Sequence, residues 1–297
     1  MKIFSIIVTY NGMRWYDRCL GSLRNSELPV ETIVIDNASS DDSVNYIKAN
    51  FPEVHLIESN ENLGFAKANN IGIRRAYDYG ADYIFLLNQD AWIEKNTISC
   101  LITTFKDNPN TGIAAPVHLN GSYTGLDHRF INYLGPQFAS DAYMHTLRTY
   151  YEVPFVNAAA WLINRCCIET VGGFDTSLFR HYGEDRNYCQ RMHYHRFRII
   201  VTTQCTICHD REERNIVDNK YISFTAQTPF FEERKYYGDI NNEINFPQEF
   251  HNLKKKKILK LLRGKFSSLK NINAKIECLH LIEKSRKKNM EKGQTWL

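Results

Sequence analysis

The chain has 297 residues, of which 43% are hydrophobic and 24% are charged, so it is long enough for one large globular domain with an appendage. No apolar stretch reaches the ~20 residues that a membrane-spanning helix needs, and the first apolar run is too short for an export signal, so we expect a cytoplasmic protein. The net charge of +4 hides an asymmetry, because residues 251–297 hold 14 Lys or Arg against 3 Glu.

Four short apolar strands alternate with helical segments in the first ninety residues. The strands are predicted at 2–10, 31–36, 54–59 and 82–88. The stretches between them carry helical spacing, capping residues and a terminating glycine. Such alternation predicts an α/β fold with a central, mostly parallel sheet flanked by helices.

The alternation weakens from about residue 112. "GIAAPV" predicts another short strand, whereas the Tyr-rich segment 118–153 is expected to be loop-like. After it come a strand and helix in "AAAWLINRCCIETVGG", a helix at 184–195 and a strand at 197–203. We therefore predict a catalytic domain over 1–225, with a nucleotide-binding half (1–110) and an acceptor half (111–225), and a helical, basic C-terminal extension over 226–297.

Polar residues follow each of the first four predicted strands. They are Thr9-Tyr10-Asn11, Asp36-Asn37, Asn60 to Asn62, and Asn88-Gln89-Asp90. Ligands of open α/β sheets bind beyond the carboxyl ends of the strands. The sequence therefore predicts a binding site at this edge.

The glycine pattern limits the class of ligand that this site can bind. The turn after the first strand, "TYNGMRW", has a single Gly, so it lacks the motif of dinucleotide-binding folds, and no P-loop is present. Asp36 alone is a weak indication of a nicotinamide cofactor. A divalent cation held by Asp90 could instead neutralise a phosphate. The alternative is that Asp90 caps the following helix.

Two further stretches carry candidate catalytic groups. Glu184 and Asp185 begin a predicted helix, where a carboxylate can accept a proton or simply complement the helix dipole. His209 is a candidate metal ligand or an ordinary surface histidine. "CTICH" matches a c-type haem attachment pattern, but that chemistry requires export, so we expect core cysteines without haem or zinc.

Seven motifs together resemble family 2 glycosyltransferases with the GT-A fold, and most of all the rhamnosyltransferase-like branch. The resemblance covers roughly residues 3–210. The motifs occur in the family's order: "FSIIVTYNG", "VIDNASSDDS", "NENLGFAKANN", "FLLNQD", "VGGFDTSLF", "GEDRNYCQR" and "CTICH".

The resemblance implies a role for each matching residue. Asp185 would be the general base of an inverting, metal-dependent transfer, supported by Glu184. Asp90 and His209 would bind Mg²⁺ or Mn²⁺, and Arg191 and Trp161 would lie on the acceptor side. The nucleotide of a UDP- or dTDP-linked sugar would be bound by Thr9, Tyr10, Asn11, Asp36, Asn62, Gly64, Asn70 and Asn88.

This sequence departs from the family pattern in three places. Asn88 replaces the first acid of the metal motif, Asn187 stands where a second acid often follows, and Ala158 replaces an expected Gly. Two alternatives therefore stay open. One is a catalytically inactive relative that binds carbohydrate or nucleotide, and the other is a nucleotidyltransferase. In the leading interpretation, the acceptor is a glycan or a lipid-linked glycan of a bacterial surface polysaccharide.

The basic extension contains "LKKKKILKLLRGKF". Its apolar residues at 253, 258, 261, 262 and 266 are expected to share one face of a helix, with lysines on the other. This pattern predicts either peripheral contact with the inner face of the cell membrane or a basic helix packed on the catalytic domain. No motif supports nucleic-acid binding.

Overall fold

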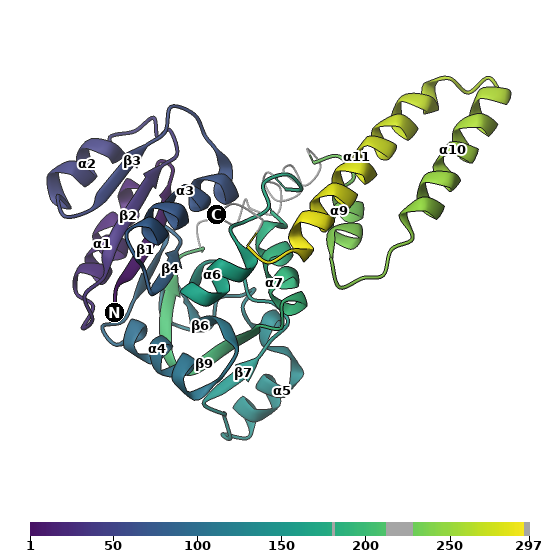
Figure 1. The fold of residues 1–297 in the computed structure, drawn as a ribbon. Coiled ribbons are helices and arrows are strands. Elements are labelled where there is room, and N and C mark those ends of the chain that lie inside the picture. Colours follow the sequence, from purple (N-terminus) through teal and green to yellow (C-terminus); the bar gives the residue numbers. More distant parts are fainter. Residues whose placement is uncertain (180–181, 212–227, 294–297) are drawn as a thin grey trace.

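The computed structural model describes residues 1–179, 182–211 and 228–293. A twisted central sheet carries helices on both faces, and a helical hairpin projects from one end (Figure 1). Within the described residues the sheet has nine strands: β1 (Ile3–Thr9), β2 (Glu31–Asp36), β3 (His55–Glu58), β4 (Tyr83–Leu87), β5 (Ala91–Ile93), β6 (Thr111–Asn120), β7 (Tyr150–Glu152), β8 (Ala160–Asn164) and β9 (Arg198–His209).

The helices enclose two apolar layers. Alternate residues of a strand point to opposite faces, so Phe4 and Ile6 of β1 lie in one buried cluster, whereas Ile3 and Ile7 lie in the other. The helices are η1 (Met13–Trp15), α1 (Tyr16–Arg24), α2 (Ser43–Asn50), α3 (Gly64–Asp78), α4 (Thr97–Asp107), α5 (Ile131–Tyr143), α6 (Arg165–Val171), α7 (Glu184–Tyr194), α9 (Phe231–Gly238), α10 (Phe246–Leu262) and α11 (Ser267–Met290).

The sheet changes character halfway across. The order is β3-β2-β1-β4-β8-β6-β9-β5, with β7 paired to β9. The pairs among β1 to β4 are all parallel, as predicted. Beyond them β8 is antiparallel to β4 and β6, while β6 is parallel to β9. The prediction of a mostly parallel sheet is therefore right for the first half, and the second half is mixed.

The predicted loop over 118–153 is wrong in part. Strand β6 continues to Asn120 because its far half pairs with β9, and the same segment contains α5 and β7. Helix α5 was not predicted because Gly135, which has a positive φ, and Pro136 lie inside it. These two residues interrupt the helical periodicity of the sequence.

Within the described residues, the predicted extension over 226–297 contains α9, α10 and α11. A turn at Gly264, whose φ is positive, joins α10 to α11. Helix α11 packs on the domain that contains the sheet: the buried carboxylate of Asp175 accepts hydrogen bonds from Ser285 Oγ and from Asn289 Nδ2 (2.7 Å for Asn289). The prediction of a packed basic helix concerned residues 253–266, which precede α11, and for that segment it stays a prediction. In the described part of the chain, no helix combines the length and apolar character needed to cross a membrane.

The predicted apolar face of the basic helix needs correction. Leu253 is buried in a cluster with Phe246 of the same helix and Ile282 of α11. Ile258 and Leu262, by contrast, are exposed. An α-helix has 3.6 residues per turn. Ile258 and Leu262 therefore lie on a different face of the helix from Phe246 and Leu253, although the sequence pattern grouped them with Leu253.

Candidate functional site

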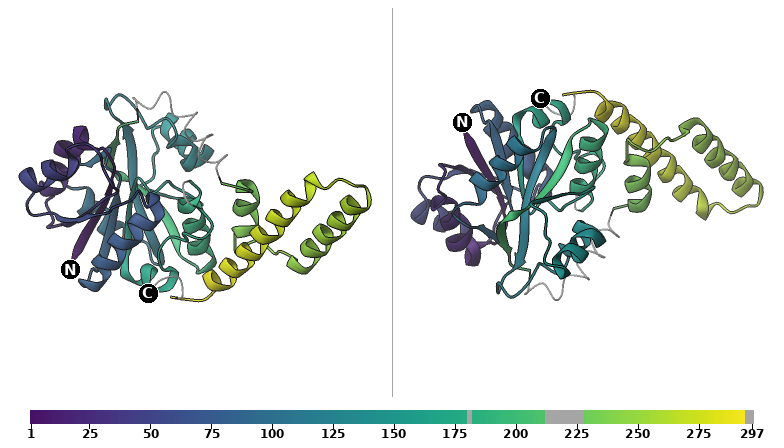
Figure 2. Two further views of the ribbon diagram at one scale, coloured as in Figure 1. Left: turned by 90° about the horizontal axis from the view of Figure 1, so that it is seen from above. Right: turned by 90° about the horizontal axis from the view of Figure 1, so that it is seen from below.

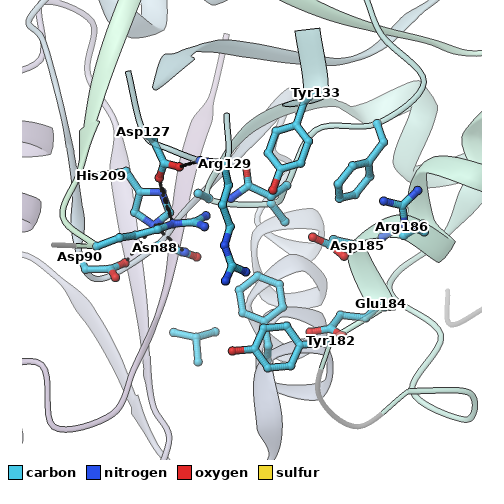
Figure 3. Close-up of a pocket in the computed structure, with 18 of the residues that line it drawn as sticks. Asn88, Asp90, Asp127, Arg129, Tyr133, Tyr182, Glu184, Asp185, Arg186 and His209 are labelled. Atoms are coloured by element: carbon cyan, nitrogen blue, oxygen red, sulfur yellow. Dashed lines mark hydrogen bonds and ion pairs between the residues drawn. The ribbon is translucent and has the colours of Figure 1, made fainter. Parts of the chain in front are cut away.

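A pocket of about 850 Å³ opens at the carboxyl ends of the central strands. It is the edge that the sequence predicts. Its walls come from the ends of β1, β4, β6 and β9, from the segments 126–129 and 155–159, from α7 and from α9 (Figure 3). Of the predicted site residues, seven line it: Thr9, Tyr10, Asn88, Asp90, Glu184, Asp185 and His209.

Gln89 explains how the ends of β1 and β4 are held together. Its Oε1 accepts hydrogen bonds from Thr9 Oγ1 (2.7 Å) and from the backbone N–H of Tyr10 (2.9 Å). The middle residue of "NQD" thus fixes the backbone on which Asn88 and Asp90 stand. Both neighbours then project toward the pocket, which they line.

Asp90 and His209 form the core of one wall. Antiparallel pairing of β5 with β9 places Ala91 opposite His209, and the Asp210 N–H donates to the Asp90 carbonyl (2.8 Å). Asp90 Oδ1 lies 3.5 Å from His209 Nε2, and both side chains are fully buried against the protein while lining the pocket. Helix α4 begins only at Thr97, so Asp90 caps no helix, and His209 is not a surface residue.

Asp127 is a site residue that the sequence did not reveal. Its Oδ2 lies 3.2 Å from His209 Nδ1 and 3.0 Å from Arg211 Nε. Burial alone would raise the pKa of Asp127, but the hydrogen bond with His209 and the charge of Arg211 outweigh it and lower the pKa. Asp127 is therefore ionised, and it engages the ring nitrogen of His209 that faces away from Asp90.

Packing and charge complete this wall. His118 is fully buried and stacks on Phe130 with ring centroids 4.5 Å apart, and it meets the His209 ring edge-on. Burial lowers the pKa of His118, so its ring is neutral. Arg129 and Arg211 bring positive charge to the pocket lining, and Arg129 extends between the two walls in Figure 3.

The donor atoms fit a divalent cation that also binds a substrate. Asp90 supplies a carboxylate oxygen and His209 an imidazole nitrogen, with the Asn88 amide 3.4 Å from the same nitrogen. No cluster of three or more His, Cys, Asp or Glu side chains in the described residues is arranged to hold a metal ion by itself. Such a partial set suits Mg²⁺ or Mn²⁺ if phosphate oxygens and water supply the remaining ligands.

Glu184 and Asp185 form the opposite wall, on the first turn of α7 (Figure 3). Glu184 is buried, and its Oε2 has no hydrogen-bond partner within the described structure. Burial and the neighbouring Asp185 raise the pKa of Glu184 to about 8. Burial also raises the pKa of Asp185, although its Oδ1 accepts the N–H of Arg186 (2.7 Å). A helix dipole alone would lower both pKa values, so the dipole does not account for this pair.

Two predicted nucleotide-binding residues lie beside the pocket without lining it. Asp36 ends β2 next to Thr9 of β1, and its Oδ2 accepts the N–H of Ser39 (3.0 Å). Asn11 Oδ1 accepts the N–H of Ser40 (2.8 Å). The second bond links the loop after β1 to the loop after β2.

Three others shape helix α3. Asn62 Oδ1 accepts the N–H of Gly64 (3.0 Å), where the backbone has a positive φ. Asn70 is bonded twice to the backbone of Phe174, through its Nδ2 (2.9 Å) and its Oδ1 (2.7 Å). None of the three is part of the pocket lining. Asn70 thus ties α3 to the "VGGFD" turn.

Trp161 and Arg191 are both fully buried, and neither is part of the pocket lining. Trp161 stacks on Phe174 at 6.2 Å between ring centroids. Arg191 donates to the carbonyls of Val171 (2.9 Å) and Gly173 (2.6 Å), and to Asn187 Oδ1 (3.1 Å). Both side chains make packing contacts in this structure, and their predicted place at the acceptor side stays a prediction. Their assignment to the acceptor side came from the family resemblance alone.

Comparison with known proteins gives a consistent result. The family model described as "Glycosyl transferase family 2" matches residues 5–172. The dTDP-rhamnosyl transferase RfbF of Shigella flexneri is 28% identical over 191 residues, which are 64% of this chain and 62% of that protein. The N-acetylglucosaminyl-diphospho-decaprenol L-rhamnosyltransferase of Mycobacterium tuberculosis is 26% identical over 215 residues, covering 63% of this chain and 69% of that one.

A solved structure extends the comparison to nearly the whole chain. The mannosyltransferase PcManGT of Pyrobaculum calidifontis, in complex with GDP-Man and Mn²⁺, matches with a TM-score of 0.56 at 16% identity, over 97% of this chain and 87% of that one. The likeness confirms the predicted GT-A type fold. The match with RfbF spans less than two thirds of that protein's length.

Proposed function

The chain belongs to glycosyl transferase family 2, and from this premise we propose that it moves a sugar from a UDP- or dTDP-linked donor to a hydroxyl group of a glycan or lipid-linked acceptor, with inversion. One observation carries the proposal. The Asp90–His209 pair and the Asp185 carboxylate line opposite walls of one pocket. That separation gives the leaving group and the attacking hydroxyl different walls.

Asp90 and His209 form the donor side in this proposal and hold Mg²⁺ or Mn²⁺. The cation, when bound, offsets the negative charge that develops on the departing diphosphate. Asp127 Oδ2 lies 3.2 Å from His209 Nδ1, so in this proposal it holds the proton of the ring on that nitrogen and leaves Nε2 available to the cation. Hydrogen bonds of this kind orient metal-binding histidines. Arg129 and Arg211 add positive charge for the same diphosphate.

Asp185 is the general base. The acceptor oxygen attacks the anomeric carbon from the face opposite the diphosphate, the bond from that carbon to the phosphate oxygen breaks, and the hydroxyl proton passes to the Asp185 carboxylate. Attack from the opposite face inverts the anomeric configuration. A carboxyl pKa raised by burial makes Asp185 a stronger base than an exposed Asp. Glu184, with a pKa of about 8, is largely neutral at pH 7.

The relatives suggest which donor to test first. The two named above are a dTDP-rhamnosyl transferase and a rhamnosyltransferase whose name specifies a decaprenol-linked acceptor. We therefore place dTDP-rhamnose first among donors and a diphospho-polyprenol glycan first among acceptors. Both choices are consistent with a role in surface polysaccharide synthesis.

The test is a transfer assay with dTDP-rhamnose and UDP-hexoses, each with and without Mn²⁺. Two quantities are measured: the release of the nucleoside diphosphate and the anomeric configuration of the product. We expect release that depends on Mn²⁺ and on Asp90, with an inverted product. Retention of configuration would contradict the proposed mechanism.

Two departures, Asn88 and Asn187, favour a second candidate, an inactive relative that only binds. Tight nucleotide binding with no turnover of any donor would support that alternative.

A further inference from the structure

Helices α10 and α11 form a hairpin that projects from the catalytic domain (Figures 1 and 2). Its distal end, residues 254–266, comprises the last turns of α10 and the turn at Gly264. We call this segment the hairpin tip. In all three views it lies away from the sheet and from the helices that cover it.

The hairpin tip exposes large apolar side chains. Leu262 is 80% exposed, Phe266 67% and Ile258 57%, and Leu259 and Leu261 are exposed as well. Ile258, Leu261 and Leu262 have the i, i+3, i+4 spacing that places side chains on one face of a helix. A cluster of exposed apolar side chains on one helix face is typical of an interaction site.

These residues are not the core side of α10. The core side is formed by Phe246 and Leu253, which are buried with Leu279 and Ile282 of α11. The exposed face points away from this core side, because Ile258 is five residues beyond Leu253 and therefore about 140° farther around the helix. The hairpin therefore keeps its own packing and presents a second apolar face.

Positive charge surrounds this second face. The hairpin tip holds seven cations and no acid, and no Asp or Glu occurs between residues 250 and 276. In the part of the chain that the structure describes, none of the seven makes an ion pair with a carboxylate. The seven are Lys254, Lys255, Lys256, Lys257, Lys260, Arg263 and Lys265.

We propose that the hairpin tip docks on an anionic lipid bilayer, with Ile258, Leu261, Leu262 and Phe266 inserted at the interface and the cations at the headgroups. An interfacial helix binds by buried apolar area together with attraction of Lys and Arg to anionic lipid. The combination of apolar side chains and cations favours a lipid bilayer over a second copy of the chain as the partner, because two hairpin tips would bring fourteen like charges together.

Docking there would hold the pocket near the membrane. Phe231 of α9 lines the pocket and also packs in the cluster that contains Phe246 and Leu253. Helix α10 is roughly 25 Å long at 1.5 Å per residue. The hairpin is thus a spacer between bilayer and pocket. The docking itself does not depend on the proposed sugar transfer, and it can be tested without substrate.

The experiment is flotation of the full chain with vesicles of phosphatidylcholine alone or mixed with phosphatidylglycerol. The first variant carries Ile258→Ser, Leu261→Ser and Leu262→Ser, and the second carries Lys254→Gln, Lys255→Gln and Lys256→Gln. The matched control removes other exposed apolar side chains, Tyr143→Ser, Met144→Ser and Leu147→Ser, which are 84%, 62% and 50% exposed at the end of α5 and beyond.

We expect binding only to the anionic vesicles and a loss with added salt. The apolar variant should partition about tenfold or more weakly, and so should the charge variant. The control should bind like the unmodified chain, and circular dichroism should show all variants folded. Equal binding to neutral vesicles, or no binding to either, would overturn the proposal. So would concentration-dependent dimers that the apolar variant abolishes in the absence of lipid.

Discussion

The two walls of the pocket are built in different ways. On the wall with Asp90, each ionisable group has another ionisable group within 3.5 Å: His209 beside Asp90, and Asp127 beside His209 and Arg211. On the wall with Asp185, two carboxyl groups follow each other on one helix turn, and a buried oxygen of Glu184 has no hydrogen-bond partner in the described structure.

The difference has a chemical meaning. The paired wall fixes charges in place, which suits a site that stabilises charge developing on a phosphate. The other wall holds carboxyl groups whose pKa is raised by burial, which suits a group that must take up a proton during the reaction. Substitutions on the two walls should therefore fail in different ways.

The largest effect is expected for Asp185→Asn. Asn keeps the shape of the side chain and its hydrogen bond from the Arg186 N–H, but it cannot accept the hydroxyl proton. We expect the transfer rate to fall about 10²–10⁴-fold, with donor binding unchanged by calorimetry. A variant that loses donor binding together with rate would place Asp185 on the donor side, against this account.

A smaller effect is expected for Asp127→Asn. Without a carboxylate at His209 Nδ1, the ring loses its fixed tautomer, so Mn²⁺ affinity in the presence of dTDP or UDP should fall roughly 10–100-fold. Calorimetry or Mn²⁺ paramagnetic resonance measures this without turnover. Asp141→Asn is the matched control, because Asp141 is also a buried carboxylate, bonded to Tyr151 (2.8 Å), and it is not part of the pocket lining. Equal losses in both variants would show that general destabilisation is the cause.

The smallest effect is expected for Glu184→Gln and concerns stability. The pKa of Glu184 is raised to about 8 in the folded chain, above its unfolded value, so the folded state holds the proton more tightly. Stability from this group is therefore present at low pH and lost as pH rises through 8. Gln cannot ionise, so the variant should melt roughly 2–4 °C higher at pH 9 and show little gain at pH 5.

The control for this comparison is the pH profile itself. If the difference in melting temperature between the two chains does not change from pH 5 to pH 9, the Glu184 carboxyl does not have the raised pKa, and the contrast between the walls weakens.

On the wall with Asp90, the positions of Asp90 and His209 were predictable from sequence, whereas the contact of Asp127 with His209 was not. Asp90 and His209 follow apolar strands, and a strand end is visible as a change from apolar to polar residues. Asp127 reaches His209 because its N–H bonds to the carbonyl of His118 (2.9 Å) as the chain turns back beside β6. No local pattern in "GLDHR" encodes that return. The contact depends on the register of β6 with β9, which is a long-range property.

The same limit applies to Arg191, which does not line the pocket. Arg191 was assigned to the acceptor side through the family motif "GEDRNYCQR". In the structure it is buried and satisfied by the carbonyls of Val171 and Gly173. Only the packing of α6 against α7 reveals these acceptors. Local sequence patterns therefore located the ends of helices and strands well. They did not identify which side chains pack between one helix or strand and the next.

The most direct test of the central claim is calorimetric binding of dTDP and UDP, with and without Mn²⁺, to the unmodified chain, to Asp90→Asn and to Asp185→Asn. We expect Mn²⁺-dependent binding that Asp90→Asn loses and Asp185→Asn keeps, because the proposal assigns the diphosphate to the first wall alone. Binding that is independent of Mn²⁺ and unaffected by Asp90→Asn would contradict the assignment of that wall.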